Sequence, residues 1–298
     1  FPHCFHERPW HKSSEQNWSS TWKQESGDSA EVSSLAARGF YEERISANLT
    51  AVPFNYYFMD CDAYGEVYDD YNPLHRNPLE ADAAERTRRL AWLASDRGLV
   101  VGAEGGNVYA LEGVHVLEGL LGPYFGWGDE DMSDRQSPYY RGRFYPPDEP
   151  EVQFKPVPLK EKYRRLHYDP AVRIPLFQAA FHDAVVTTHH WSNDLFKYPE
   201  VTETVELLEI LWMCPPMVNF NLGTLKERGD ELKAHFDRWS PVHRRLGFSR
   251  MTGFRFLTDD HLVQETTWED GTRIVVNFGE SDFAKDGVVV EAGDVAFQ

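Results

Sequence analysis

Two apolar runs that each end on acidic residues dominate the pattern of hydrophobic and polar positions. Residues 55–62 read Asn-Tyr-Tyr-Phe-Met-Asp-Cys-Asp, and residues 99–106 read Leu-Val-Val-Gly-Ala-Glu-Gly-Gly. Apolar runs of this length, bounded by turn residues, are typical of buried parallel strands, so we expect strands over about 54–60 and 99–103. Between them, residues 79–97 carry apolar side chains at helical spacing, which predicts a helix.

The rest of the pattern predicts more helices, a long insertion and a β-rich tail. Residues 122–158 are rich in Pro, Gly, Tyr and Phe and are expected to form the insertion. A hairpin turn is expected at Asp270-Gly271. Helices are expected over about 29–51, 107–121, 200–211 and 224–246, a short helix or strand over 174–186, and strands over 254–257, 261–268, 273–278, 288–290 and 295–297.

A strand, a helix and a strand with acids at both strand ends is the layout found at the active face of a barrel enzyme. We therefore expect an α/β fold, with a (β/α)8 TIM-type barrel region over residues 1–249 and a small antiparallel, β-sandwich-like domain over 250–298. Only about five barrel-type units precede the tail, and unpaired barrel strands would expose their edges. We expect the chain to be the C-terminal part of a barrel whose first strands come from upstream sequence or from another chain.

The composition of the chain limits the classes of partner that it is expected to bind. The net charge of -18 disfavours nucleic acid and anionic membrane surfaces, and no apolar stretch is long enough to span a membrane. The three cysteines are scattered and odd in number, which favours a reducing, cytoplasmic compartment over a disulfide framework. Aromatic residues make up 14% of the chain, which suits carbohydrate binding, although most single rings are expected to belong to the core.

The acidic strand ends are the first candidates for chemistry. Asp60 and Asp62 lie two residues apart, so on an extended strand both would face the same side. Paired carboxylates are what hydrolysis of a glycosidic bond needs, which favours a glycoside hydrolase. As general acid, Glu104 would need a pKa raised towards neutral by burial, while Asp60 or Asp62 stays ionised and attacks the anomeric carbon. The alternative is structural: aspartates paired with an arginine, and Glu104 capping a helix.

A second polar cluster lies between residues 181 and 194. Its side chains predict hydrogen bonds to sugar hydroxyls, with Trp191 as a stacking platform, and Tyr64 lies in an acidic, aromatic loop suited to substrate contacts. The predicted substrate-binding residues are Asp62, Tyr64, His182, Asp183, His190 and Trp191.

Metal and cofactor chemistry is not expected. His189, His190 and Asp194 could each ligate a metal ion, but adjacent histidines on an extended backbone point apart and no HExxH-type spacing is present. The N-terminal His3, Cys4, His6 and His11 are interpreted as ordinary loop residues. The sequence has no GxSxG, no GxGxxG and no P-loop.

The motifs at 58–62, 101–106 and 181–191, with Cys214-Pro215-Pro216-Met217, resemble a known group from about residue 50 to the end. The chain resembles the retaining α-N-acetylgalactosaminidases of glycoside hydrolase families 101 and 129, the second more than the first. The resemblance implies a (β/α)8 barrel with β-sandwich domains that cleaves α-linked N-acetylgalactosamine, as in mucin-type O-glycans, through a covalent intermediate. It also implies Asp60 as nucleophile and Glu104 as acid/base, with Asp62 as the competitor for nucleophile.

One departure from the family pattern affects activity. The front of the barrel and any N-terminal β domain are not visible in the sequence, so the isolated chain is expected to be inactive and poorly soluble. Two other functions stay open: an α-glycosidase of different sugar specificity, such as an α-galactosidase-like enzyme, and a non-catalytic carbohydrate-binding or structural module.

Overall fold

The computed structural model describes residues 33–64, 67–71, 73–142 and 152–298. The expectations for residues 1–30, including the N-terminal histidines and Cys4, therefore lie outside the described residues. The chain divides into two compact units, residues 1–115 and 116–298, and each is described by itself.

The first unit contains two parallel strands, β1 (Tyr56–Met59) and β2 (Val100–Glu104), as predicted. Their register places Met59 beside Ala103, so the carboxyl ends of both strands meet at one edge. Residues that follow this register pair are therefore neighbours across the strands.

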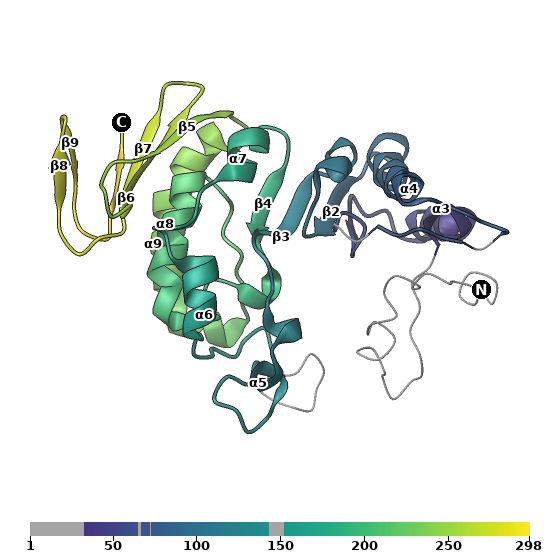
Figure 1. Cartoon of the computed structure of the whole chain (residues 1–298), viewed down its shortest axis with the longest axis horizontal. Helices are drawn as coiled ribbons and strands as arrows, with labels where there is room; N and C mark the ends of the chain where they lie inside the picture. The colour runs from purple at the N-terminus through teal and green to yellow at the C-terminus, as the bar shows by residue number, and fades with distance from the viewer. Residues whose placement is uncertain (1–32, 65–66, 72, 143–151) are drawn as a thin grey trace. The chain divides into compact units, whose positions relative to one another are not determined.

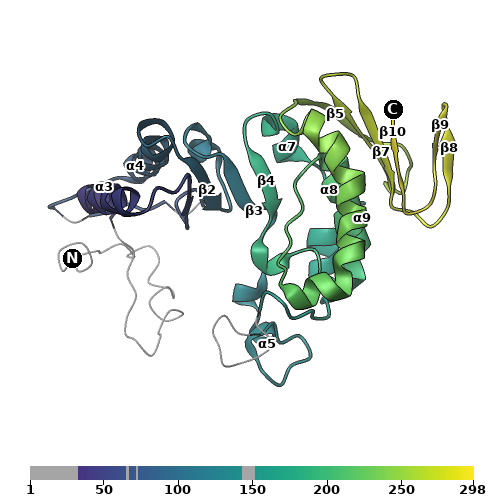
Figure 2. The same cartoon turned by 180° about the vertical axis from the view of Figure 1, so that it is seen from behind.

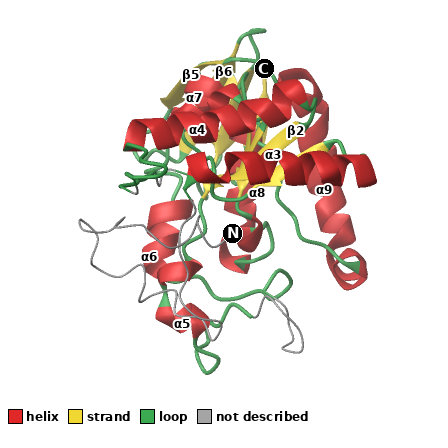
Figure 3. Ribbon diagram, turned by 90° about the vertical axis from the view of Figure 1, so that its right-hand side faces the viewer, coloured by secondary structure: helices red, strands yellow, loops and turns green. Residues whose placement is uncertain are grey.

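Two helices lie over this strand pair, one preceding β1 in the sequence and the other connecting β1 to β2 (Figure 3). α3 (Ser34–Ala51) and α4 (Leu79–Ala91) lie side by side (Figure 3). α4 continues into a π-helical turn, η1 (Trp92–Asp96), so the helix predicted over 79–97 is confirmed. Leu90 and Leu93 are fully buried, because the apolar positions of this helix repeat on one face.

The predicted helix over 107–121 is wrong. The chain forms a short 3₁₀ helix, η2 (Val108–Glu112), and then the strand β3 (Val116–Gly122). Burial along β3 alternates between half-buried and buried positions, which is the period of a strand and not of a helix. In the second unit β3 pairs in parallel with β4 (Val186–His189), which follows the short helix α7 (Leu176–Phe181).

Two helices form the centre of the second unit. α8 (Thr202–Trp212) and α9 (Leu222–Leu246) lie between the β3–β4 pair and the C-terminal strands (Figure 1, Figure 2). One hydrophobic core runs through these layers and includes Leu121, Leu208 and Trp268. The second unit is thus a layered structure around α8.

The second unit also contains several short helices. Its insertion carries η3 (Gly126–Gly128), α5 (Glu130–Ser133), α6 (Glu161–Tyr163) and η4 (Arg164–Tyr168). Two more, η5 (Trp191–Asn193) and η6 (Pro199–Val201), follow β4.

The C-terminal strands form an antiparallel sheet in the order β10-β7-β6-β5, with a separate hairpin of β8 and β9. The predicted strands of the tail and the turn at Asp270-Gly271 are confirmed, because β6 and β7 pair across that turn and Gly271 has a φ of 87°. β8 was not predicted. The strands are β5 (Met251–Phe256), β6 (Val263–Trp268), β7 (Arg273–Asn277), β8 (Phe283–Lys285), β9 (Val288–Val290) and β10 (Val295–Phe297).

The fold is therefore mixed α/β, with parallel strands joined through helices and a separate antiparallel sheet. A closed barrel and a domain boundary after residue 249 stay predictions. None of the helices in the described part of the chain is both long enough and apolar enough to cross a membrane.

Candidate active site

Asp60 and Glu104 lie next to each other at the carboxyl edge of β1 and β2. Asp60 directly follows Met59, Glu104 directly follows Ala103, and those two preceding residues are register partners. The carboxyl groups of Asp60 and Glu104 share a hydrogen bond. Their oxygens and the Cys61 Sγ lie within 4.8 Å of one another. The strand register alone thus brings the two predicted catalytic acids together.

The proximity of the two carboxyl groups changes their protonation. Partial burial, followed by the hydrogen bond and the charge of Glu104, raises the pKa of Asp60 to about 6. Two carboxyl groups in contact ionise with difficulty at the same time, so the pair holds one proton up to near-neutral pH. From the sequence, Asp60 or Asp62 is expected to stay ionised; in the structure, the neighbouring Glu104 carboxylate opposes a second negative charge and so favours the protonated form of Asp60.

Asp62 faces a different environment from Asp60. β1 ends at Met59, and Cys61 has a left-handed backbone with a φ of 63°, so the chain turns before Asp62. Asp60 is exposed beside Glu104, whereas Asp62 is buried and accepts a hydrogen bond of 2.8 Å from Arg89 Nη2. The expectation that both aspartates face the same side is therefore wrong.

Side chains of α4 and η2 hold the turn after β1 in place. Arg86 Nη1 donates to the Cys61 carbonyl at 3.1 Å, and Tyr109 Oη donates to the Asp62 carbonyl at 3.2 Å. Arg86 and Arg89 were not among the residues predicted from the sequence. The signal was present, because both arginines lie on the buried face of α4 with Leu90, and a buried guanidinium needs an anionic or carbonyl partner.

Glycine is required directly after Glu104. Gly105 has a φ of 58°, and a Cβ there would lie 2.5 Å from Cδ2 of Tyr64. Any residue with a Cβ atom at position 105 would therefore require the backbone or the Tyr64 ring to move. The absence of a side chain lets the half-exposed Tyr64 ring lie against the end of β2, so this predicted substrate contact stays near the acidic pair.

Comparison with known proteins identifies the family. The model of the glycosyl hydrolases related to the GH101 family, GH129, matches residues 17–267. The chain belongs to this family. The resemblance stated from the motifs is thereby confirmed, and among curated proteins no sequence matches this GH129 chain.

Solved structures with a similar fold come from α-N-acetylgalactosaminidase NagBb of Bifidobacterium bifidum. Its complex with GalNAc is 16% identical with a TM-score of 0.55, and the match covers 90% of this chain and 36% of that one. Its ligand-free form is 15% identical with a TM-score of 0.56, over 85% and 34% of the two chains. The GH129 chain thus spans little more than a third of the neighbour's length, and at this identity the likeness shows the fold.

The other predicted substrate contacts lie in the second unit. The ring nitrogens of His182 contact the carbonyls of Ser249 and Met213 at 2.8 and 3.2 Å, and burial lowers its pKa. Asp183 is exposed. The His182 ring therefore links α7 to the chain after α8 and after α9.

His190 and Trp191 form an aromatic stack. Their ring centroids are 3.8 Å apart, and Tyr124 covers the His190 ring at 5.2 Å. His190 Nδ1 accepts a hydrogen bond of 3.0 Å from the Ser192 amide. Part of the predicted sugar platform is thus already covered by protein rings.

A buried carboxylate between two histidines was not found from the sequence. Glu209 lies 3.0 Å from His235 Nε2 and 3.5 Å from His189 Nδ1, all inside the core of the second unit. Burial alone would raise the pKa of Glu209, but the two imidazoles outweigh it and lower the pKa. These residues come from β4, α8 and α9, so only the tertiary fold brings them together.

In the described part of the chain, side chains that could ligate a metal ion lie at the acidic pair. Within the described ranges, the group of side chains arranged closely enough to ligate one ion is Asp60, Cys61 and Glu104. His189, His190 and Asp194, named from the sequence, do not form such a group in that part of the chain. The first group consists of the acidic pair and Cys61, so its possible ligands belong to the candidate active site.

Proposed function

We propose that this GH129 chain carries the catalytic carboxylates of a retaining α-N-acetylgalactosaminidase. The observation that supports the proposal is the hydrogen-bonded, register-matched pair of Asp60 and Glu104. Retaining glycosidases place their two carboxyl groups about 5–5.5 Å apart, and inverting enzymes about 6.5–9.5 Å apart to admit a water molecule. The carboxylate oxygens of Asp60 and Glu104 lie within 4.8 Å of each other, which is shorter than the separation in inverting enzymes and favours the retaining arrangement.

The mechanism uses the single proton of the pair. When the proton lies on Glu104, Asp60 is ionised and attacks the anomeric carbon, while Glu104 protonates the departing glycosidic oxygen. The sugar is then β-linked to the Asp60 carboxylate. Glu104, now ionised, removes a proton from water, which displaces Asp60 and releases the sugar with its original α configuration.

The supporting residues have separate proposed roles. Asp62, fixed by Arg89, positions the turn that carries Asp60, and Tyr64 offers its exposed ring to the sugar beside Glu104. Binding roles for His182, Asp183, His190 and Trp191 stay predictions. α-Linked N-acetylgalactosamine is the proposed substrate because the family and the name of the structural neighbour point to it.

A panel of aryl α-glycosides tests the proposal on the full-length protein that contains this chain. We expect hydrolysis of the N-acetylgalactosaminide, and losses of about 10²-fold or more in Asp60→Ala and Glu104→Ala. Glu112→Gln, an exposed acid of the same unit, is the matched control and should keep parental activity. Turnover of the α-galactoside alone would favour the other specificity, and full activity in both acid variants would end the proposal.

A further inference from the structure

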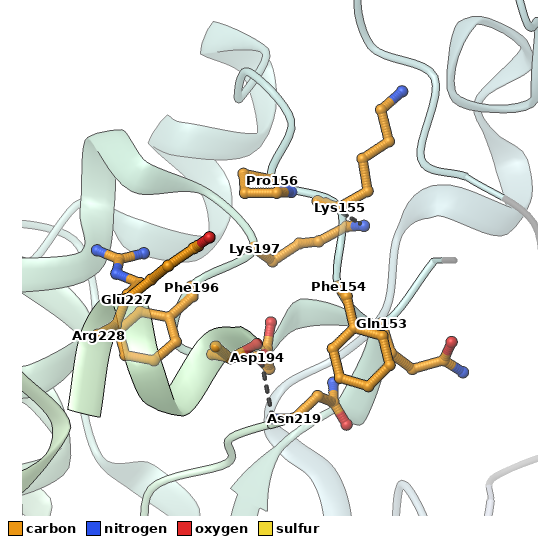
Figure 4. A pocket seen from close by; sticks show the side chains of 11 residues that line it. Gln153, Phe154, Lys155, Pro156, Asp194, Phe196, Lys197, Asn219, Glu227 and Arg228 are labelled. Carbon is orange, nitrogen blue, oxygen red and sulfur yellow. Dashed lines mark hydrogen bonds between the residues drawn. The ribbon is translucent and has the colours of Figure 1, made fainter. Parts of the chain in front are cut away.

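In each of the two units, one side chain holds a loop by donating to several backbone carbonyls. In the second unit, the buried Lys197 ammonium donates to three carbonyls at 3.0, 2.6 and 2.8 Å, beside a cavity of about 110 Å³ (Figure 4). In the first unit, the Tyr109 hydroxyl donates to the carbonyls of Asp62 and Tyr64. The loop that Tyr109 holds follows β1 and therefore adjoins the acidic pair.

Tyr109 is itself supported by α4. It belongs to η2, the 3₁₀ helix that follows β2. Thr87 Oγ1 donates to the Tyr109 carbonyl at 2.9 Å, and a Cβ at Gly113 would lie 2.3 Å from the Ala91 amide nitrogen, so η2 lies directly against α4. The backbone of Tyr109 is thus fixed on α4, and its hydroxyl extends from this support to the loop after β1.

The hydroxyl of Tyr109 joins two carbonyls of that loop. A phenolic hydroxyl has one hydrogen to donate, so the carbonyls of Tyr64 and of Asp62, the second at 3.2 Å, share it. Arg86 Nη1 donates to the carbonyl of Cys61 at 3.1 Å. Three carbonyls between residues 61 and 64 are therefore held by side chains of α4 and η2.

The Tyr64 ring is the exposed part of this arrangement. The residue is 46% exposed, and its Cδ2 lies 2.5 Å from the place that a Cβ of Gly105 would take, directly after Glu104. A hydrogen bond to the Tyr64 carbonyl limits where the ring can lie, because the backbone that carries the ring is held. A ring that is ordered before the ligand arrives costs less entropy on binding.

We propose that Tyr109 is a positioning residue for sugar binding. Its hydroxyl holds the Tyr64 ring beside the acidic pair, where the ring contacts the sugar. The inference rests on the proposed function, because it requires a sugar at Asp60 and Glu104.

Steady-state kinetics of the full-length protein with an aryl N-acetyl-α-galactosaminide test the inference. Tyr109→Phe keeps the ring and removes the donor, and the two carbonyls are exposed enough for water to replace it, so the fold is kept. We expect KM to rise about tenfold and kcat to stay within about twofold, because the catalytic acids themselves are not bonded to Tyr109. Tyr71→Phe, which removes an exposed hydroxyl that donates to Asp69, is the matched control and should keep the parental KM.

A double substitution shows whether Tyr109 acts through Tyr64. Tyr64→Ala removes the ring, so adding Tyr109→Phe should raise KM by about twofold or less beyond Tyr64→Ala alone. A further tenfold rise in the double variant would show that Tyr109 acts elsewhere and would overturn the inference. A fall in kcat with parental KM in Tyr109→Phe would overturn it as well.

Two measurements that need no turnover separate this inference from the catalytic proposal. Amide hydrogen exchange of residues 61–64 should be about tenfold faster in Tyr109→Phe and unchanged in Tyr71→Phe. Calorimetric titration with methyl N-acetyl-α-galactosaminide should show about tenfold weaker binding in Tyr109→Phe.

The outcomes of these measurements are distinct. Unchanged exchange in Tyr109→Phe, or faster exchange with parental sugar affinity, overturns the inference whatever the activity. A parent protein that binds the glycoside without hydrolysing an aryl substrate ends the catalytic proposal, while weaker binding in Tyr109→Phe still supports the role of Tyr109. A parent protein that neither binds nor hydrolyses ends both.

Discussion

Arg89 donates a hydrogen bond of 2.8 Å to Asp62, and this ion pair distinguishes two aspartates that the sequence leaves equivalent. The Asp62 side chain is buried against α4, whereas Asp60 is exposed and hydrogen-bonded to Glu104. A nucleophile must reach the anomeric carbon, so the arrangement favours Asp60 for that role and gives Asp62 a positioning role.

Arg89→Met tests the positioning role of the pair. The substitution leaves the Asp62 carboxylate buried without a partner, and we expect the free energy of unfolding to fall by about 3 kcal/mol. Adding Asp62→Asn should recover most of the loss, because the uncompensated charge is gone. Chemical denaturation measures both effects, with the exposed Arg76→Met as control. Loss of activity in Asp62→Asn, together with near-parental activity in Asp60→Asn, would instead identify Asp62 as nucleophile.

The pH dependence of catalysis follows from the acidic pair. The mechanism needs one proton on the pair, and the raised pKa of about 6 is the point at which the pair loses that proton. We therefore expect kcat/KM for the aryl substrate to fall as the pH increases through about 6, and to fall also at acidic pH, where both carboxyl groups are protonated and Asp60 cannot attack. Glu112→Gln should show the same profile as the parent. A rate that is level between about pH 4 and about pH 7 would contradict this assignment.

Asp60→Asn should stabilise the protein above about pH 6. The folded-state pKa of Asp60 is raised from its ordinary value of 3.8, so the folded state loses stability as the pH rises between the two values. An amide removes the repulsion with Glu104. Because Asp60 is exposed and water screens the charges, the expected gain is about 1 kcal/mol at neutral pH, and it should vanish below about pH 4. Thermal unfolding at both pH values measures the difference, and an equal gain at low pH would refute the electrostatic cause.

Glu209 is expected to be essential for the stability of the second unit. Glu209→Ala leaves His189 and His235 buried without their carboxylate, and we expect a loss of about 3 kcal/mol in the free energy of unfolding. Glu203→Ala, at an exposed position of the same helix, should change it by about 0.5 kcal/mol or less. Equal effects of the two substitutions in denaturant unfolding would show that the buried cluster contributes nothing.

The strand-helix-strand unit and the acidic pair could be predicted from the sequence because both depend on local patterns. The apolar runs specify β1 and β2, and the two acids lie at the ends of those runs. The helix predicted over the residues of β3 is wrong because the single valine and three leucines of this strand fit a helical period as well as an alternating one over so short a stretch.

The details of the site depend on contacts that the sequence pattern does not contain. Cys61 adopts a left-handed backbone conformation, which a glycine in the sequence would have indicated but a cysteine does not. The turn that separates Asp60 from Asp62 could therefore not be foreseen. Asp194 and Glu209 likewise gain their surroundings from segments distant in the sequence, such as Asn219 and His235. Packing in three dimensions therefore decides which acids are exposed and which are buried.

The configuration of a glycosyl azide tests the central claim most directly. With sodium azide and an aryl N-acetyl-α-galactosaminide carrying a highly activated leaving group, Asp60→Gly should give the β-azide, because azide displaces the leaving group directly in the space left by the nucleophile. Glu104→Ala should give the α-azide, because azide then displaces Asp60 from the β-linked glycosyl-enzyme. Proton NMR of the products distinguishes the two anomers. The reverse assignment, or hydrolysis without azide at the parental rate in either variant, would contradict the account.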